Sequence, residues 1–143
     1  MKHSYSSGAV LIGPQNKVAV VSQHGTSWSL VKGTLEHKEN KLQALRREIE
    51  EETGVNNLKV IKELGTYERY IIGIDGGEDK SEFKTITIFL CTTNQTELNP
   101  QDPHNPEARW VEPDEVAELL THPKDKQFFT NHLEQVKEFI SNR

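Results

Sequence analysis

Three things are scarce in this sequence: cysteine, long apolar runs and excess positive charge. The single cysteine, Cys91, excludes an internal disulfide framework, and its apolar surroundings favour a buried structural residue over a nucleophile. No run of 18 apolar residues is present, and the first eight residues, MKHSYSSG, lack the apolar core of a signal peptide. These absences predict a cytoplasmic protein with no membrane partner.

The formal net charge is −5, which argues against binding nucleic acid or anionic membranes through bulk charge. A small anionic substrate remains compatible with this charge, because bound metal ions can reverse the local field. The 143 residues suffice for one domain with a real core and are too few for two, so residues 1–143 are predicted to form a single domain.

Apolar runs and turn residues predict an α/β protein in which helices pack on a central mixed sheet. The predicted strands are residues 10–12, 18–21, 28–31, 83–92 and 107–111, with a long strand or bent pair at 58–72. The predicted late helices are residues 113–120 and 123–140, and the main loops are 73–78 and 93–106.

An early helix is predicted from Asn40 to Gly54. Asn40 is a good N-cap, and Gln43 stands three residues later, as a capping box requires. Gly54 can adopt the left-handed conformation that ends a helix. The apolar stripe predicted to be buried consists of Leu42, Leu45 and Ile49.

The last two turns of this helix concentrate negative charge. Glu48, Glu51 and Glu52 stand at i, i+3 and i+4, so they project from one side of the helix. They lie at the end that already carries the negative pole of the helix dipole. The simple interpretation is a solvated acidic face. The alternative is a site for hard divalent cations, which prefer oxygen ligands.

The wider pattern from residue 33 to residue 55 resembles the Nudix box of the Nudix hydrolase family. The matching specific positions are Gly33, Glu39, Arg47, Glu48, Glu51, Glu52 and Gly54, and the matching apolar positions are Ile49 and Val55. The resemblance implies an α/β/α sandwich around a central mixed sheet. It also implies hydrolysis of a nucleoside diphosphate linked to another group, with Mg²⁺ or with Mn²⁺ as a substitute.

The resemblance also implies roles for individual residues. Glu48, Glu51 and Glu52 would hold the metal ions, with help from the backbone carbonyl of Gly33. Arg47 would pair with a neighbouring carboxylate and fix it. Glu39 would be structural or support the ligands, and the general base is left open between a glutamate of the box and Glu107, which is also a candidate extra ligand.

A weaker resemblance concerns the substrate. Lys84, between Phe83 and Thr85, with Lys80 four residues earlier, resembles the diadenosine tetraphosphate hydrolase branch of the family, in which lysines near this position contact the polyphosphate chain. Tyr67 and Tyr70 are candidates for stacking on adenine, although aromatic residues on strands are more often part of the core.

Three functional hypotheses follow. The first is a hydrolase of dinucleoside polyphosphates such as diadenosine tetraphosphate, which would yield ATP and AMP. The second is a nucleoside triphosphate pyrophosphatase of the house-cleaning type. The third is a non-catalytic nucleotide sensor, against which the complete carboxylate set argues. All three have a small nucleotide as partner, and the sequence leaves a monomer or a homodimer open.

Overall fold

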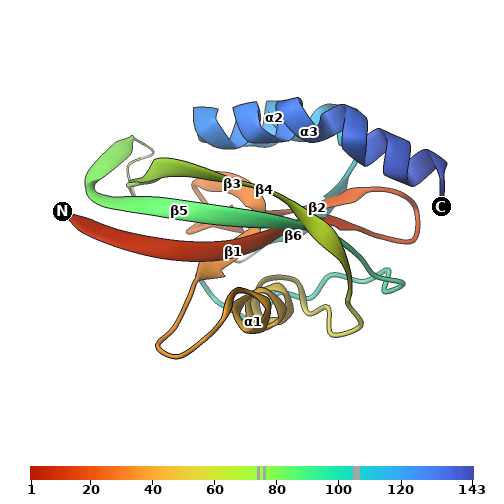
Figure 1. Ribbon diagram of the computed structural model, residues 1–143, viewed down its shortest axis with the longest axis horizontal. Coiled ribbons are helices and arrows are strands. Elements are labelled where there is room, and N and C mark those ends of the chain that lie inside the picture. The colour runs from red at the N-terminus through yellow and green to blue at the C-terminus, as the bar shows by residue number, and fades with distance from the viewer. Residues whose placement is uncertain (74, 76, 105–106) are drawn as a thin grey trace.

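The computed structural model describes residues 1–73, 75, 77–104 and 107–143. In these residues a mixed sheet is covered by one helix on one face and by two helices on the other (Figure 1), which confirms the predicted α/β/α sandwich. The strands are β1 (Lys2–Ile12), β2 (Val18–Gln23), β3 (Ser27–Thr34), β4 (Lys59–Ile72), β5 (Glu78–Thr92) and β6 (Ala108–Val111). The helices are α1 (Lys41–Thr53), α2 (Pro113–Leu119) and α3 (Pro123–Ser141).

The sheet has the order β4-β5-β1-β3-β2-β6. β1 and β5 run parallel at its centre, and the other neighbouring strands are antiparallel. Helices cover both faces, so the central strands are buried on both sides, as their continuous apolar runs predict. Val10, Leu11 and Ile12 of β1 are fully buried.

Successive residues of each strand point alternately into two separate hydrophobic cores. Val10, Ile86 and Phe128 belong to the core between the sheet and the layer of α2 and α3. Leu11 and Leu45 belong to the core between the sheet and α1. The face on which a strand residue lies therefore decides which helix layer it can contact.

Helix α1 has the predicted ends. The Asn40 side chain accepts a hydrogen bond from Gln43 N, and the Gln43 side chain accepts one from Asn40 N, at 2.8 and 2.9 Å. Gly54 closes the helix in the left-handed conformation, with φ of 75°. The prediction for Leu42 is wrong, because its side chain is 47% exposed. Leu42 lies at the border of the face that Leu45 buries against the sheet.

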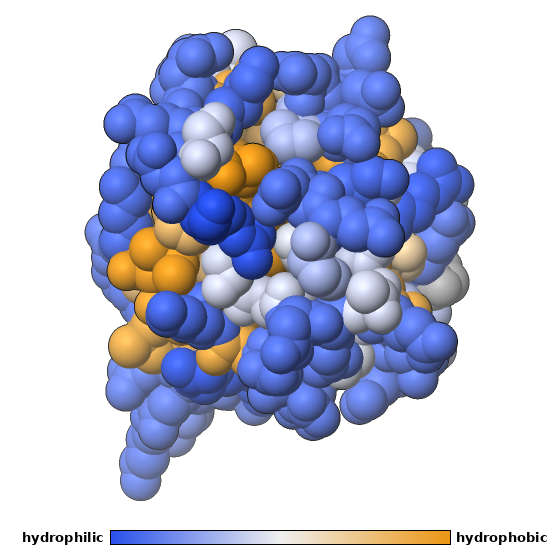
Figure 2. All heavy atoms as spheres, turned by 90° about the vertical axis from the view of Figure 1, so that its right-hand side faces the viewer, coloured by the Kyte–Doolittle hydropathy of each residue, from blue (hydrophilic) through white to orange (hydrophobic). Residues whose placement is uncertain are grey.

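The other predicted elements occur with different bounds. β1 begins at Lys2 rather than residue 10, and β4 is one strand whose pairing with β5 shifts register at three places. The predicted loops include residues 74, 76, 105 and 106, which lie outside the described residues. Within the described ranges, no helix is long and apolar enough to cross a membrane. The end of the molecule near the C terminus is mainly hydrophilic, with apolar surface in separate areas (Figure 2).

Candidate active site

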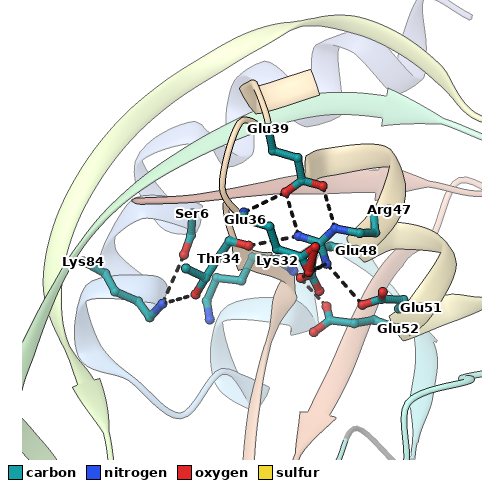
Figure 3. Close-up of polar contacts among 10 residues, drawn as sticks. All are labelled: Ser6, Lys32, Thr34, Glu36, Glu39, Arg47, Glu48, Glu51, Glu52 and Lys84. Atoms are coloured by element: carbon teal, nitrogen blue, oxygen red, sulfur yellow. Dashed lines mark hydrogen bonds and ion pairs between the residues drawn. The ribbon is translucent and has the colours of Figure 1, made fainter. Parts of the chain in front are cut away.

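A cavity of about 300 Å³ lies where β3 ends and the chain leads into α1. Its lining combines acidic residues of α1 with basic residues on the sheet face that α2 and α3 cover. The charged and histidine side chains around it are those of His24, Lys32, Glu48, Glu52, Arg69, Lys84, Asp102 and His104. Charges of opposite sign thus surround one space, and Figure 3 shows several of these residues with their polar contacts.

Glu48 packs directly over Gly33. A Cβ atom placed on Gly33 would lie 1.9 Å from Cδ of Glu48 and 2.2 Å from its Oε1, so no other residue fits without moving the carboxylate. Burial raises the pKa of Glu48, and the charge of Glu51 adds to this effect. Glycine at position 33 is therefore explained by the close approach of the carboxylate.

Arg47 holds the carboxylates of this region in place. Its Nε donates to Oε2 of Glu39 at 2.6 Å, and its Nη1 donates to Glu48 at 2.7 Å and to Glu51 at 3.3 Å (Figure 3). Nη2 donates to the backbone oxygen of Thr34 at 3.0 Å. The hydrogen bond from Arg47 lowers the pKa of Glu39 to about 2. Arg47 thus links the loop after β3 to the acidic end of α1.

Glu52 is buried, with 3% of the residue exposed, and its Oε1 accepts the backbone N–H of Lys32 at 2.9 Å. Burial raises the pKa of Glu52 above its usual value, and the charge of Glu48 adds to this. Lys32 is 5% exposed, and burial together with the charge of Arg69 lowers its pKa. This carboxylate is held in the site although its ionised form is disfavoured there.

The donor set suits a hard divalent ion, although the side chains are not arranged around one. No three His, Cys, Asp or Glu side chains of the described residues are placed to hold a metal ion as they stand. Glu48, Glu51 and Glu52 nevertheless offer six carboxylate oxygens from one side of α1, and a cation would offset their mutual repulsion. Mg²⁺ and Mn²⁺ prefer such oxygen ligands.

Lys84 projects from strand β5 into the lining of the cavity, across from the carboxylates of α1. Its Nζ donates to Oγ1 of Thr34 at 2.7 Å and to Oγ of Ser6 at 3.3 Å, and it lies 3.5 Å from Glu82 (Figure 3). Burial lowers the pKa of Lys84. Two hydroxyl groups and one carboxylate therefore fix the direction of its ammonium group.

The segment 99–104 is bonded to the end of α1 by its backbone. Asn99 N donates to the oxygen of Thr53, and Gln101 N and Asp102 N both donate to the oxygen of Glu51, at 2.7 to 3.2 Å. This places Asp102 in the cavity lining, where its charge adds to the burial that raises the pKa values of Glu48 and Glu52. His104 follows it and joins the β2–β3 turn, because its backbone oxygen accepts from His24 N.

Sequence reasoning assigned no role to Lys32, Arg69, Asp102 or His104, which line the cavity. Lys32 directly precedes Gly33, so its position beside the Nudix box was a usable signal. Asp102 and His104 carried only the signal of a long polar loop. Arg69 carried none, because its place depends on the pairing of distant strands.

Six predicted site residues are not among those that line this cavity. Two of them, Arg47 and Glu51, lie beside it, because Arg47 donates both to Glu51 and to Glu48 of the lining. Lys80 lies over the ring of Tyr70, 5.9 Å from its centroid, and Tyr70 packs against Phe83 on the sheet face of the α1 layer. Tyr67 donates its hydroxyl hydrogen to Asp125 under α3. Exposed Glu107 pairs with Arg109 at 2.5 Å. The structure brings Gly33, Glu48, Glu52 and Lys84 together at the cavity. It places Arg47 and Glu51 next to this lining and leaves Tyr67, Tyr70, Lys80 and Glu107 apart from it.

Comparison with known proteins agrees with this geometry. Residues 2–132 match the NUDIX domain. The RNA pyrophosphohydrolase of Pelagibacter ubique (strain HTCC1062) is 28% identical over 147 residues, which cover 94% of this chain and 91% of that protein. Among solved structures, a Caenorhabditis elegans Ap4A hydrolase complex superposes with a TM-score of 0.76 at 16% identity, covering 98% of this chain and 99% of the other. The Escherichia coli dihydroneopterin triphosphate pyrophosphohydrolase gives 0.74 at 17% identity, covering 94% and 99%.

The match to the NUDIX domain over most of the chain defines the class of protein, a hydrolase of phosphoanhydride bonds. The chain belongs to the Nudix family. As a Nudix hydrolase it is a pyrophosphohydrolase that acts on a nucleotide substrate, and enzymes of this family generally use divalent metal ions.

Proposed function

We propose that this enzyme uses Mg²⁺, with Mn²⁺ as a substitute, to hydrolyse the phosphate chain of a dinucleoside polyphosphate such as diadenosine tetraphosphate. The observation that carries the proposal is the mixed charge of one cavity. Carboxylates from α1 face it on one side, and the cations Lys32, Arg69 and Lys84 face it on the other. A site that hydrolyses a polyphosphate chain needs both signs of charge. Cationic side chains bind the phosphate oxygens, and carboxylates hold the metal ions that hydrolysis requires.

Glu48, Glu51 and Glu52 are the proposed metal ligands. When bound, a divalent ion neutralises phosphate charge and lowers the pKa of a coordinated water molecule. Arg47 keeps two of the three carboxylates oriented through its bonds to Glu48 and Glu51. The raised pKa of Glu52 means that its ionised form gains more from a nearby cation than an exposed carboxylate would.

The basic residues bind the substrate in this proposal. The ammonium of Lys32 makes no hydrogen bond or ion pair within the described part of the chain, although only 5% of the residue is exposed, so it has donors to offer a phosphate oxygen. Lys84 is directed by Ser6 and Thr34 toward the same cavity. When substrate binds, Lys84 would exchange its hydroxyl partners for phosphate oxygens. Its contribution to binding would increase with the number of phosphates.

The test is a substrate panel with identified products, run with Mg²⁺ at saturation. Diadenosine tetraphosphate should give ATP and AMP, faster than any nucleoside triphosphate gives a monophosphate and pyrophosphate. Rapid hydrolysis of a triphosphate with none of the dinucleotide would instead establish the house-cleaning activity.

A second candidate is favoured by one comparison. The Pelagibacter relative is named an RNA pyrophosphohydrolase, and it matches nearly the whole chain. The substrate would then be the 5′-triphosphate end of RNA, a phosphate chain that the same cations could bind. The panel should therefore include a short 5′-triphosphorylated oligoribonucleotide, and a kcat/KM above that for diadenosine tetraphosphate would select this function.

A further inference from the structure

Arg69 is unusual because its guanidinium is buried and still lines the cavity. Its side chain is 3% exposed, and an arginine buried to this extent almost always has a partner, which here is Asp125. β4 carries it on the face toward α3, since its partner Asp125 belongs to that helix. An arginine here therefore connects the α3 layer to the cavity in which the α1 carboxylates lie.

The contacts of Arg69 leave part of its donor capacity unused. Nε donates to Oδ1 of Asp125 at 2.9 Å, and Nη2 donates to Oδ2 at 3.4 Å. Nη1 donates to the backbone oxygen of Tyr70 at 2.8 Å. A guanidinium has five N–H groups, so one on each terminal nitrogen has no acceptor within the described residues.

Asp125 fixes this orientation from the first turn of α3. It is 1% exposed and also accepts the hydroxyl hydrogen of Tyr67. The carboxylate therefore holds Arg69 on one edge of the guanidinium and leaves one N–H on each terminal nitrogen for another ligand. Asp125 itself is not part of the cavity lining.

A second buried cation lies near Arg69. Lys32 lines the same cavity with 5% of its surface exposed, so its positive charge faces the space that Arg69 also faces. Two buried cations that face one space form a site for an anion.

We propose that Arg69 binds a phosphate group of the substrate and that Asp125 is the positioning residue that directs it. This rests on the proposed function for the nature of the substrate. The paired N–H geometry of a guanidinium matches the oxygens of a phosphate group, which it binds through two parallel hydrogen bonds. The contact is made with the bound substrate before any bond changes, so Arg69 contributes to KM more than to kcat.

The test compares variants for binding inorganic tripolyphosphate to the metal-free protein by calorimetry in EDTA. The triple variant Tyr67→Phe/Arg69→Met/Asp125→Leu removes the whole buried polar network, and apolar replacement of a buried ion pair commonly preserves folding. Tyr67→Phe alone serves as its control. Arg109→Met is the matched arginine control, because Arg109 stacks on Trp28 outside the cavity.

We expect the triple variant to fold and its Kd for tripolyphosphate to rise at least tenfold. Arg69→Lys should give an intermediate Kd, and both controls should stay within twofold of the parent. Asp125→Asn, measured at a temperature where it is folded, should raise Kd although it does not touch the ligand. An unchanged Kd in the folded triple variant would overturn the role of Arg69, and an unchanged Kd in Asp125→Asn would overturn the positioning role.

Kinetics separate this proposal from the proposed function. For whichever substrate is hydrolysed, Arg69→Lys should raise KM at least fivefold and leave kcat within threefold of the parent; a purely structural arginine would leave KM of the folded enzyme unchanged. If no nucleotide is hydrolysed but tripolyphosphate binding still depends on Arg69, the proposed function fails and the anion site stands. If hydrolysis is normal and the Kd for tripolyphosphate does not depend on Arg69, the anion site is wrong and the proposed function stands.

Discussion

The carboxylate of Glu48 occupies the space that a side chain on Gly33 would need. The first residue of the Nudix box and the first glutamate of its acidic cluster are therefore in direct contact, although 14 residues separate them in the chain. This contact ties the loop after β3 to α1 at the point where the carboxylates gather.

Gly33→Ala should displace Glu48, since the new Cβ would lie 1.9 Å from its Cδ. We expect kcat to fall roughly 100-fold, because a shift of about 1 Å in an active site costs that much. The Mg²⁺ concentration for half-maximal rate should rise as well. Gly77→Ala is the control, because a Cβ there meets only Asp75 Oδ1 at 3.6 Å. Equal rates for both variants would contradict the steric account.

Glu52→Gln should lower turnover on the order of 100-fold or more, because it removes a charged metal ligand but keeps an oxygen that can accept from Lys32 N. Glu50→Gln is the matched control on the same helix, where Glu50 is exposed. Steady-state rates at saturating Mg²⁺ check the prediction. Near-normal turnover of Glu52→Gln would remove this residue from the ligand set.

Metal-free stability should depend on pH through Glu52. Burial raises its pKa from 4.5 to about 8 in the folded state. Between these values the folded protein binds more protons than the unfolded chain, so the free energy of unfolding should fall as pH rises, by about 1 kcal/mol or more. Lys32 acts only above this window, because its pKa is lowered from 10.5 to about 8. Urea unfolding in EDTA at pH 5 to 8 should show this decline, and Glu52→Gln should flatten it.

Lys84→Ala should raise KM about tenfold for a long phosphate chain, the loss expected for one charge-assisted hydrogen bond. The increase should be smaller for a nucleoside diphosphate substrate. Lys80→Ala is the control, because Lys80 lies over Tyr70 outside the cavity lining. A similar KM increase for both lysine variants would show that the cavity does not define the phosphate site.

Gly54→Ala should destabilise the fold for two reasons. Its φ of +75° costs a side chain about 1–2 kcal/mol. A Cβ would also lie 2.6 Å from the backbone oxygen of Asn99, in the segment that carries Asp102. Gly25→Ala isolates the first cost, because φ there is +72° and a Cβ would have no described atom within 4 Å. Thermal unfolding should show a larger loss for Gly54→Ala, and only this variant should lose activity.

Local signals made α1 predictable. Its capping box and terminal glycine act within one or two turns, so Asn40, Gln43 and Gly54 could be read directly from the sequence. Leu42 was misjudged because helical spacing shows which residues share a face and not where the packed surface ends. The polar start of β1 was missed because parallel pairing with β5 supplies its hydrogen bonds.

The metal-ligand candidates could be predicted because their spacing lies within one helix. Of the substrate candidates, Lys84 lines the cavity, whereas Tyr67, Tyr70 and Lys80 do not. The side of the sheet on which a residue lies depends on how distant strands pair, which the sequence does not show. Tyr67 and Tyr70 are three residues apart on one strand, so they face opposite layers. Arg69 enters the cavity lining because strand pairing and α3 together place it there.

The parallel pairing of β1 with β5, in which Ser4 lies opposite Lys84, has a consequence for insertions. Sliding β5 by one residue would turn Lys84 toward the α1 layer and bring the ring of Phe83 into the anionic substrate's path. Insertions or deletions in the β4–β5 hairpin should thus be tolerated when they change its length by an even number of residues or when the extra residues bulge out of the sheet. Those that shift the register of β5 by an odd number of residues should inactivate the enzyme.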